Sequence, residues 1–422
     1  MSTPHTSRRR LWPLRFIGVE ALGGIVLLAA AALALACANS PLAHAYESLW
    51  RQRLSLGMPL LAAGDLRFWV NDGLMSIFFL LVGLEIRREL HDGTLSDPRV
   101  ATLPIIAAAG GVVVPALSYM LVARGPQVGR GWAIPTATDI AFAVGVLSLI
   151  GRVPTVLRML LLTLAIADDI AAILIIAIFY SGGLVAAQLL LVAAGIALVL
   201  LLQALGVRSA LAYVFPGAVL WLGMLQAGVH PALTGVVLGL LTPVTAGFGP
   251  GARQRARKWR SPSVANVTLS PRSLSGTPVV RVEAMLHPYV AFGIMPLFAF
   301  ANAGVRLEGL DFSAGPPLEV IMGIVLALVL GKPAGIVLAA LAAVRLKVAE
   351  LPPGVRWSQL MLLGVVAGIG FTMSIFIANL AFEEPALLVA AKFAVLAGSA
   401  IAATLATTLG RLSSLAQPTP KA

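Results

Sequence analysis

Two adjacent acids, Asp168 and Asp169, are the residues of this chain whose types and spacing most directly indicate chemistry. They lie at the centre of a mostly apolar stretch of 24 residues, Leu157–Tyr180. A helix of that length is about 36 Å long and crosses a hydrocarbon core of about 30 Å, which places both carboxylates near the midplane of a membrane. A charge there costs at least about 2.5 to 3.5 kcal/mol. The pair therefore predicts a buried site for a proton and a small cation, the alternative being a polar vestibule without function.

The chemistry expected of this pair is exchange. Burial and mutual repulsion both disfavour the doubly charged form, so the two acids should titrate as a coupled pair. Na+ or Li+ suits these hard oxygen ligands. If both acids must lose a proton to hold one monovalent cation, two protons move against one ion, and the exchange is electrogenic.

The elements that position this site are predicted to be membrane helices. Of 422 residues, 59% are hydrophobic and only 11% are charged, against about 25% in a typical soluble domain. The fold class expected is an all-α polytopic membrane protein of about twelve transmembrane helices. Their predicted ranges are roughly 16–38, 66–90, 100–123, 130–150, 156–180, 184–205, 209–225, 228–246, 283–303, 319–344, 358–381 and 386–410.

The charged residues orient these helices. The chain has 30 Lys and Arg against 18 Asp and Glu, and most of the cations fall in loops on the side that carries the N-terminus, which indicates topology rather than nucleic-acid binding. By the positive-inside rule both termini are cytoplasmic. The predicted organisation is a basic N-terminus at 1–15, a transporter domain at 16–410 with a cytoplasmic loop at about 247–282, and a tail at 411–422. A cleaved signal peptide is the alternative for the first apolar run.

Cys37 is the only cysteine, so neither an intrachain disulfide nor a cysteine metal cluster is possible.

Two of the spans are interrupted. The fourth contains AIPTATDIAFAVG, in which Pro135 removes a backbone donor and Thr136, Thr138 and Asp139 can satisfy the freed backbone groups. The eleventh contains VVAGIGFTMSIFIANL, in which glycines precede Thr372 and Ser374. Both are predicted to be discontinuous helices. Asp139 is then placed to compensate the positive ends of half-helices, with simple helix capping as the alternative.

Lys332 is a further charge within a span. It lies near the middle of 319–344, too deep to reach either surface comfortably, so it needs an anion or a helix dipole nearby. The alternative is a lysine that only lines a wet cavity.

Several motifs, in order along the chain, resemble those of the NhaA-type sodium/proton antiporter family: IPTATDIAFAVGVLSLIG, LAIADDIAAILIIAIFY, GVHPALTGVVLG, LFAFANAGV, GKPAGI and GIGFTMSIFIANLAF. The resemblance implies twelve helices with an inverted repeat and two discontinuous, crossing helices; paired breaks of this kind are a known feature of NhaA itself. It implies an electrogenic exporter of Na+ (or Li+) in exchange for H+ by alternating access, serving pH and sodium homeostasis. It also implies a bacterial inner-membrane location, a homodimer within the lipid bilayer, and no cofactor beyond the transported ions.

The resemblance also implies roles for individual residues. Asp168 and Asp169 would bind the transported Na+ or Li+ and the protons, with Thr138 beside the ion path. Lys332 would pair with Asp168, and Lys332 and Asp139 would compensate charge at the helix crossing. The residues that match the family's cytoplasmic, pH-responsive mouth are Glu85, Arg88, Glu89, Glu283 and His287. Ala284 replaces a second histidine of the family pattern, and ordinary surface salt bridges are the alternative there.

Three other classes were weighed. An intramembrane aspartyl protease also places acids on separate spans, but it has no use for a buried lysine or an adjacent third acid. A symporter of an organic solute would need more aromatic and amide groups around the acids, and a channel would not need paired broken helices. No nucleophile triad, phosphate loop or metal-ligand cluster is visible, so an enzyme is not expected.

Overall fold

The computed structural model describes residues 12–53, 64–150, 153–183, 185–207, 209–244, 277–308 and 315–415. Most of the predicted cytoplasmic loop at 247–282, most of the predicted N-terminal segment at 1–15 and most of the tail at 411–422 lie outside these residues. Within them, helices are the only regular secondary structure apart from an isolated bridge between Arg53 and Asp65. The predicted all-α polytopic fold is therefore confirmed.

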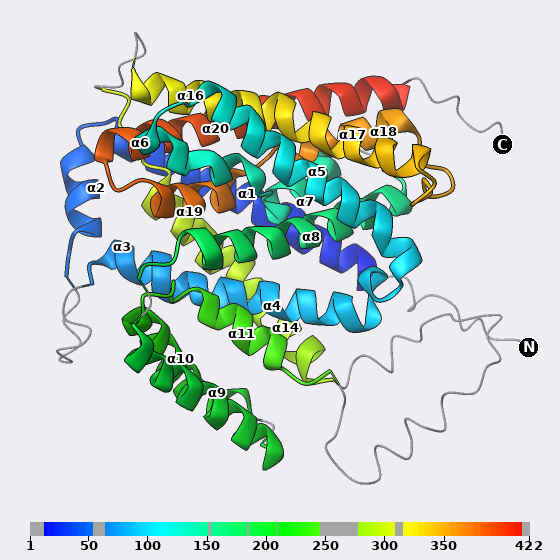
Figure 1. The fold of residues 1–422 in the computed structure, drawn as a ribbon. Coiled ribbons are helices and arrows are strands. Elements are labelled where there is room, and N and C mark those ends of the chain that lie inside the picture. The colour runs from blue at the N-terminus through cyan, green and yellow to red at the C-terminus, as the bar shows by residue number, and fades with distance from the viewer. Residues whose placement is uncertain are drawn as a thin grey trace, which may run out of the picture. The chain divides into compact units, whose positions relative to one another are not determined.

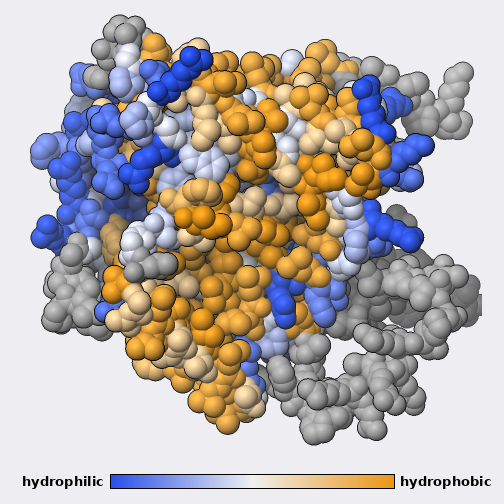
Figure 2. Space-filling model, viewed as in Figure 1, coloured by the Kyte–Doolittle hydropathy of each residue, from blue (hydrophilic) through white to orange (hydrophobic). Residues whose placement is uncertain are grey.

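Eight helical segments of the described chain are long and apolar enough to cross a membrane, and three bent pairs of helices raise the number to as many as eleven. The predicted span at 228–246 contains the nine-residue helix α11, Leu233–Leu241, which is too short to count by itself. Large apolar side chains cover the outside of these segments; Leu190 and Ile178, for example, are 75% and 69% exposed. The face seen in Figure 2 is accordingly largely hydrophobic. This is a multi-span membrane protein.

The chain divides into two compact units. Unit 1 comprises 1–70, 98–175 and 291–422, and unit 2 comprises 71–97 and 176–290. The helices of unit 1 (Figure 1) are α1 (Trp12–Ala38), α2 (Ala43–Trp50), α3 (Leu66–Phe68), α5 (Pro98–Val122), α6 (Pro126–Gly129), η4 (Arg130–Thr136), α7 (Ile140–Leu149), most of α8 (Thr155–Phe179), α15 (Met295–Asn302), α16 (Pro316–Leu326), η8 (Ala327–Gly331), α17 (Lys332–Arg345), α18 (Trp357–Ala367), α19 (Phe371–Ala381) and α20 (Pro385–Leu415).

Unit 2 is smaller. Its helices are α4 (Met75–Asp92), η3 (Thr94–Ser96), η5 (Ala186–Gln188), α9 (Leu189–Ala204), η6 (Ala210–Tyr213), α10 (Val214–Ala227), α11 and α14 (Pro278–Tyr289). Within it α4 packs against α11 and α14, and α9 packs against α10. Two short π-helical segments, η2 (Trp69–Leu74) and η7 (Val290–Ile294), lie where the chain passes from one unit to the other.

Close helix packing in unit 1 depends on small residues. Helices α5 and α17 are in extensive contact, and they meet at Gly110 and Gly335. A Cβ atom on Gly110 would lie 2.3 Å from the Gly335 carbonyl oxygen, and one on Gly335 would lie 2.2 Å from the Gly110 carbonyl oxygen. Glycine is therefore required at both positions for the two backbones to approach, as is common where helices associate in a membrane. This crossing holds Lys332, the first residue of α17, in its place.

Two spans of unit 1 are broken where the sequence predicts. The segment Pro126–Thr136 meets α7 at a bend of 52°, and α18 meets α19 at a bend of 47°. Between the first two halves, Ala137 and Asp139 have extended backbone conformations. At the other break, a Cβ atom on Gly368 would lie 2.5 Å from the Leu328 carbonyl oxygen, so the chain passes too close to a neighbour for any larger residue.

Candidate ion-exchange site

The two helix breaks are joined to one another by polar contacts. The Asp139 backbone N–H donates to the Ile369 carbonyl at 2.8 Å, and the Ser374 hydroxyl donates to the Ile134 carbonyl at 2.6 Å. These bonds satisfy backbone groups that the interrupted helices leave open, which is a requirement for irregular backbone at membrane depth. The two breaks thus form one crossing within unit 1.

Asp139 bridges the two half-helices that begin at this crossing. Its Oδ1 accepts a hydrogen bond from the Phe142 N–H at 3.0 Å, which caps α7, and its Oδ2 accepts one from the Thr372 N–H at 3.1 Å in the first turn of α19. The Thr372 hydroxyl also donates to Oδ2. A single buried carboxylate therefore faces the N-terminal, partially positive ends of two helices. Helix capping and charge compensation, posed above as alternatives, are one arrangement here.

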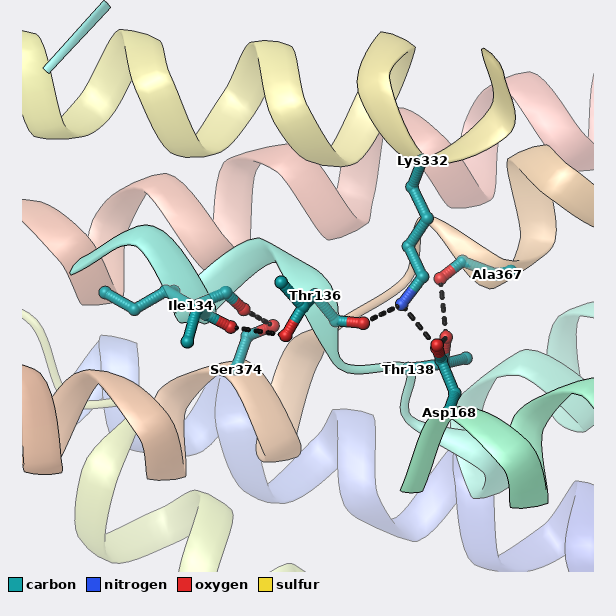
Figure 3. A network of polar contacts seen from close by, with 8 residues as sticks. Ile134, Thr136, Thr138, Asp168, Lys332, Ala367 and Ser374 are labelled. Atoms are coloured by element: carbon teal, nitrogen blue, oxygen red, sulfur yellow. Dashed lines mark hydrogen bonds and ion pairs between the residues drawn. The ribbon is translucent and has the colours of Figure 1, made fainter. Parts of the chain in front are cut away.

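Lys332 and Asp168 form a fully buried ion pair. The Lys332 Nζ lies 2.6 Å from Asp168 Oδ2, and both side chains are 0% exposed. The ammonium also donates to the Thr136 carbonyl at 2.5 Å, one of the groups released by the break before α7. Figure 3 shows the lysine reaching from α17 to these two acceptors, with Asp168 approaching from α8. The π-helical segment η8 immediately precedes Lys332, and such segments often accompany functional residues.

Thr138 completes this cluster. Its hydroxyl lies 2.6 Å from Asp168 Oδ2 and 2.9 Å from the Ala367 carbonyl at the end of α18, and its one hydrogen serves one acceptor at a time (Figure 3). Asp168 Oδ2 thus receives both Lys332 and Thr138, whereas Asp168 Oδ1 is buried and has no hydrogen-bond partner among the described residues. A carboxylate oxygen in that state has room for a further proton or cation.

Asp169 is the second acid of the pair and is 2% exposed. It lies close enough to Lys332 to interact with it electrostatically. Successive residues of a helix point about 100° apart, so the lysine that contacts Asp168 directly cannot meet Asp169 equally well. The cluster therefore holds two acids and one base in a volume that excludes water, and one further cation would balance its charge.

The five residues of the predicted mouth all belong to unit 2. Arg88 of α4 forms an ion pair with Glu283 of α14. Glu89 and His287 lie near this pair, because Glu89 acts electrostatically on Glu283 and Arg88 acts on His287. Glu89 also accepts the Thr94 N–H at 2.6 Å. Glu85 is half-buried in the same helix. The structure therefore places these residues in a polar cluster of their own.

The partners of several groups at the breaks were not predicted from the sequence. Thr136 and Thr372 lie beside the predicted breaks, but Thr372 meets Asp139 only because the breaks cross. The carbonyls of Thr136 and Ala367 find their donors for the same reason. Asp72 was not singled out, although an acid inside an apolar span is itself a signal. Its Oδ1 lies 3.3 Å from the Nε2 of His230.

Comparison with known proteins agrees with the geometry. A family model described as Na+/H+ antiporter 1 matches residues 14–409. This chain belongs to the Na+/H+ antiporter 1 family. A relative from Acidovorax sp. (strain JS42), named Na(+)/H(+) antiporter NhaA, is 56% identical over 398 residues, which cover 93% of this chain and 89% of the relative.

Two further members of the Na+/H+ antiporter 1 family are similarly close. The NhaA antiporter of Janthinobacterium sp. (strain Marseille) is 52% identical over 93% of this chain and 90% of its own length. The NhaA 2 antiporter of Pseudomonas putida (strain KT2440) is 52% identical over 94% of this chain and 92% of its own length. The family resemblance predicted from the motifs is thus confirmed over nearly the whole chain.

Proposed function

We propose that this protein is a secondary Na+/H+ antiporter, not an enzyme, that exports Na+ or Li+ across the bacterial cytoplasmic membrane in exchange for protons. The observation that carries the proposal is the buried Lys332–Asp168 ion pair with Asp169 beside it. Family membership and the relatives' names support the same activity. Both termini are proposed to be cytoplasmic and the protein to act as a homodimer in the lipid bilayer, in the service of pH and sodium homeostasis.

The proposed mechanism is competition for Asp168. In the structure Lys332 occupies the oxygen that a cation would need, and an ion pair in such a site is strong only while water stays out. When Na+ enters, it takes its oxygens from Asp168, Asp169 and Thr138, and Lys332 must leave Asp168. Because the Lys332 charge leaves Asp168 as the Na+ charge arrives, the net charge of the buried site stays low.

The direction of exchange follows from the coupling of protons and cation. Either protons or a metal ion neutralise the acids of the site. By alternating access, the metal-bound form moves Na+ outward and the protonated form moves protons inward. Asp139 keeps the two half-helices of the crossing in register in both forms. When Na+ binds, Asp169 gives up one proton and Lys332, on leaving Asp168, gives up the other. Two protons then move against one Na+, so the cycle is electrogenic, and no cofactor is required.

The decisive experiment measures exchange in everted membrane vesicles. Addition of NaCl or LiCl should collapse a pre-formed pH gradient in vesicles that contain the wild-type protein, while KCl should not. Asp169→Asn should abolish this response, because one of the two exchangeable charges is gone. The matched control is Asp92→Asn, which removes an exposed acid at the end of α4 and should leave exchange intact. Sodium-dependent exchange by the Asp169→Asn protein at the wild-type rate would refute the site.

A second measurement tests electrogenicity. In proteoliposomes an imposed membrane potential should change the initial rate of exchange, because moving one net charge across 100 mV involves about 2.3 kcal/mol. Rates that are indifferent to the potential would contradict a stoichiometry of two protons for one cation.

A further inference from the structure

Unit 1 contains a second buried cation that exchange at Asp168 does not use. Lys392 lies in α20 and is only 6% exposed. Its Nζ lies 3.4 Å from the Oδ1 of Asn302, at the end of α15. The same oxygen accepts a hydrogen bond from the side-chain amide of Asn379, in α19, at 3.0 Å.

This environment does not compensate the charge of Lys392. Lys332, the other buried lysine, has a carboxylate at 2.6 Å and a carbonyl at 2.5 Å. Lys392 has one long contact to a neutral amide oxygen that is already shared with Asn379. Among the described residues, no carboxylate lies within the 4.0 Å of an ion pair from Lys392. A buried ammonium with so little compensation is costly.

A second cation makes the imbalance larger. The guanidinium of Arg67, in α3, is close enough to act electrostatically on Lys392. Arg67 also forms no ion pair with a described residue, and its Nε is buried without a hydrogen-bond partner there. Two positive charges repel more strongly when one of them is buried, as Lys392 is, than they do in water, and an anion beside them would relieve that repulsion.

We propose that Arg67 and Lys392 form a binding site for a small inorganic anion, such as chloride, with the amides of Asn302 and Asn379 beside it. The charged groups of the cluster, an ammonium and a guanidinium, are donors only, and each has donor capacity to spare. A metal cation is disfavoured because two positive charges already face the site. Arg67 is partly exposed, so the anion can enter from water without an opening of the helix bundle.

The test is the dependence of thermal unfolding on the anion. The full-length protein in detergent would be melted in choline chloride and in choline gluconate at equal ionic strength, since choline avoids competition at the Na+ site. A ligand that binds only the folded state raises the melting temperature with its concentration, and we expect a rise of about 2 °C or more in chloride. A wild-type protein with equal melting temperatures in the two salts would overturn the proposal.

Variants locate the effect. Lys392→Met should lose most of the chloride-dependent shift whatever its own melting temperature. Arg67→Gln, at a partly exposed position, supplies the same test if Lys392→Met does not fold. Arg345→Met removes an exposed cation from the last turn of α17 and should keep the full shift. A full shift in both Lys392→Met and Arg67→Gln would refute the site, as would stabilisation by phosphatidylglycerol vesicles in gluconate with none by chloride.

Discussion

Two ion pairs in this chain, one in each unit, differ in how far water reaches them. In unit 1 the Lys332–Asp168 pair is 0% exposed on both sides. In unit 2 the Arg88 side chain is 31% exposed while its partner Glu283 is 4% exposed. When one member of a fully buried ion pair is removed, the other charge is left without water or a partner, which is costly. A partly exposed charge can be solvated instead, so the loss of its partner costs less. The comparison predicts that the first pair sets stability and exchange, and the second only adjusts them.

The largest effect is expected from Lys332→Met. It leaves Asp168 in a dry site without its cation, and breaking a buried pair in this way costs about 3 to 5 kcal/mol. Adding Asp168→Asn removes the stranded charge and should restore most of the loss, although exchange would stay absent. Chemical or thermal unfolding of the purified single and double variants measures both steps. If the double variant were no more stable than Lys332→Met, the charge itself would not be the cause.

Thr372→Val tests the helix crossing itself. The hydroxyl that donates to Asp139 is lost while the shape of the side chain is kept, and hydrogen bonds to charged groups are worth about 1.5 to 3 kcal/mol. Stability should fall by about that amount, and the affinity for Na+ should fall with it because one of the two bonds from Thr372 to Asp139 is gone and α19 is held less firmly against α7. The matched control is Thr404→Val, whose exposed hydroxyl only bonds within α20. Equal losses in both variants would remove the special role of the crossing.

The smallest effect is expected from Arg88→Gln. Glutamine can still donate to Glu283, and the partly exposed site is open to water, so unfolding should be easier by only about 1 kcal/mol. Exchange should persist with an altered pH profile. A loss as large as that of Lys332→Met would show that both pairs are equally insulated, and the contrast between the units would fail.

Much of this molecule could be predicted from the sequence because membrane physics is local along the chain. A run such as Leu157–Tyr180 must be helical, since lipid offers no partner for its backbone groups. Asp168, Asp169 and Lys332 stand out in such runs because a charge there is costly. The breaks at Pro135 and Gly368 are visible for similarly local reasons, as proline lacks a donor and glycine tolerates close approach.

Contacts between distant segments were not predictable in the same way. Thr372 meets Asp139 across 233 positions of sequence, and Lys332 meets the Thr136 carbonyl across 196. The surroundings of Lys392 depend in the same way on Asn302 of α15 and Asn379 of α19, which lie 90 and 13 positions away in the sequence. The residues that flank these positions in the sequence do not indicate which distant group each position will contact.

The sequence by itself determined that this protein spans a membrane and that two of its helices break. It also determined that Asp168, Asp169 and Lys332 lie deep within apolar helices. Hydrophobicity, helix length and backbone hydrogen bonding fix those features one segment at a time. Only the tertiary structure decided which charge is compensated by which group, because that depends on how separate helices pack. Lys332 has a carboxylate and a carbonyl within reach and Lys392 has a shared amide, a difference made by helix packing and not by the residues next to either lysine.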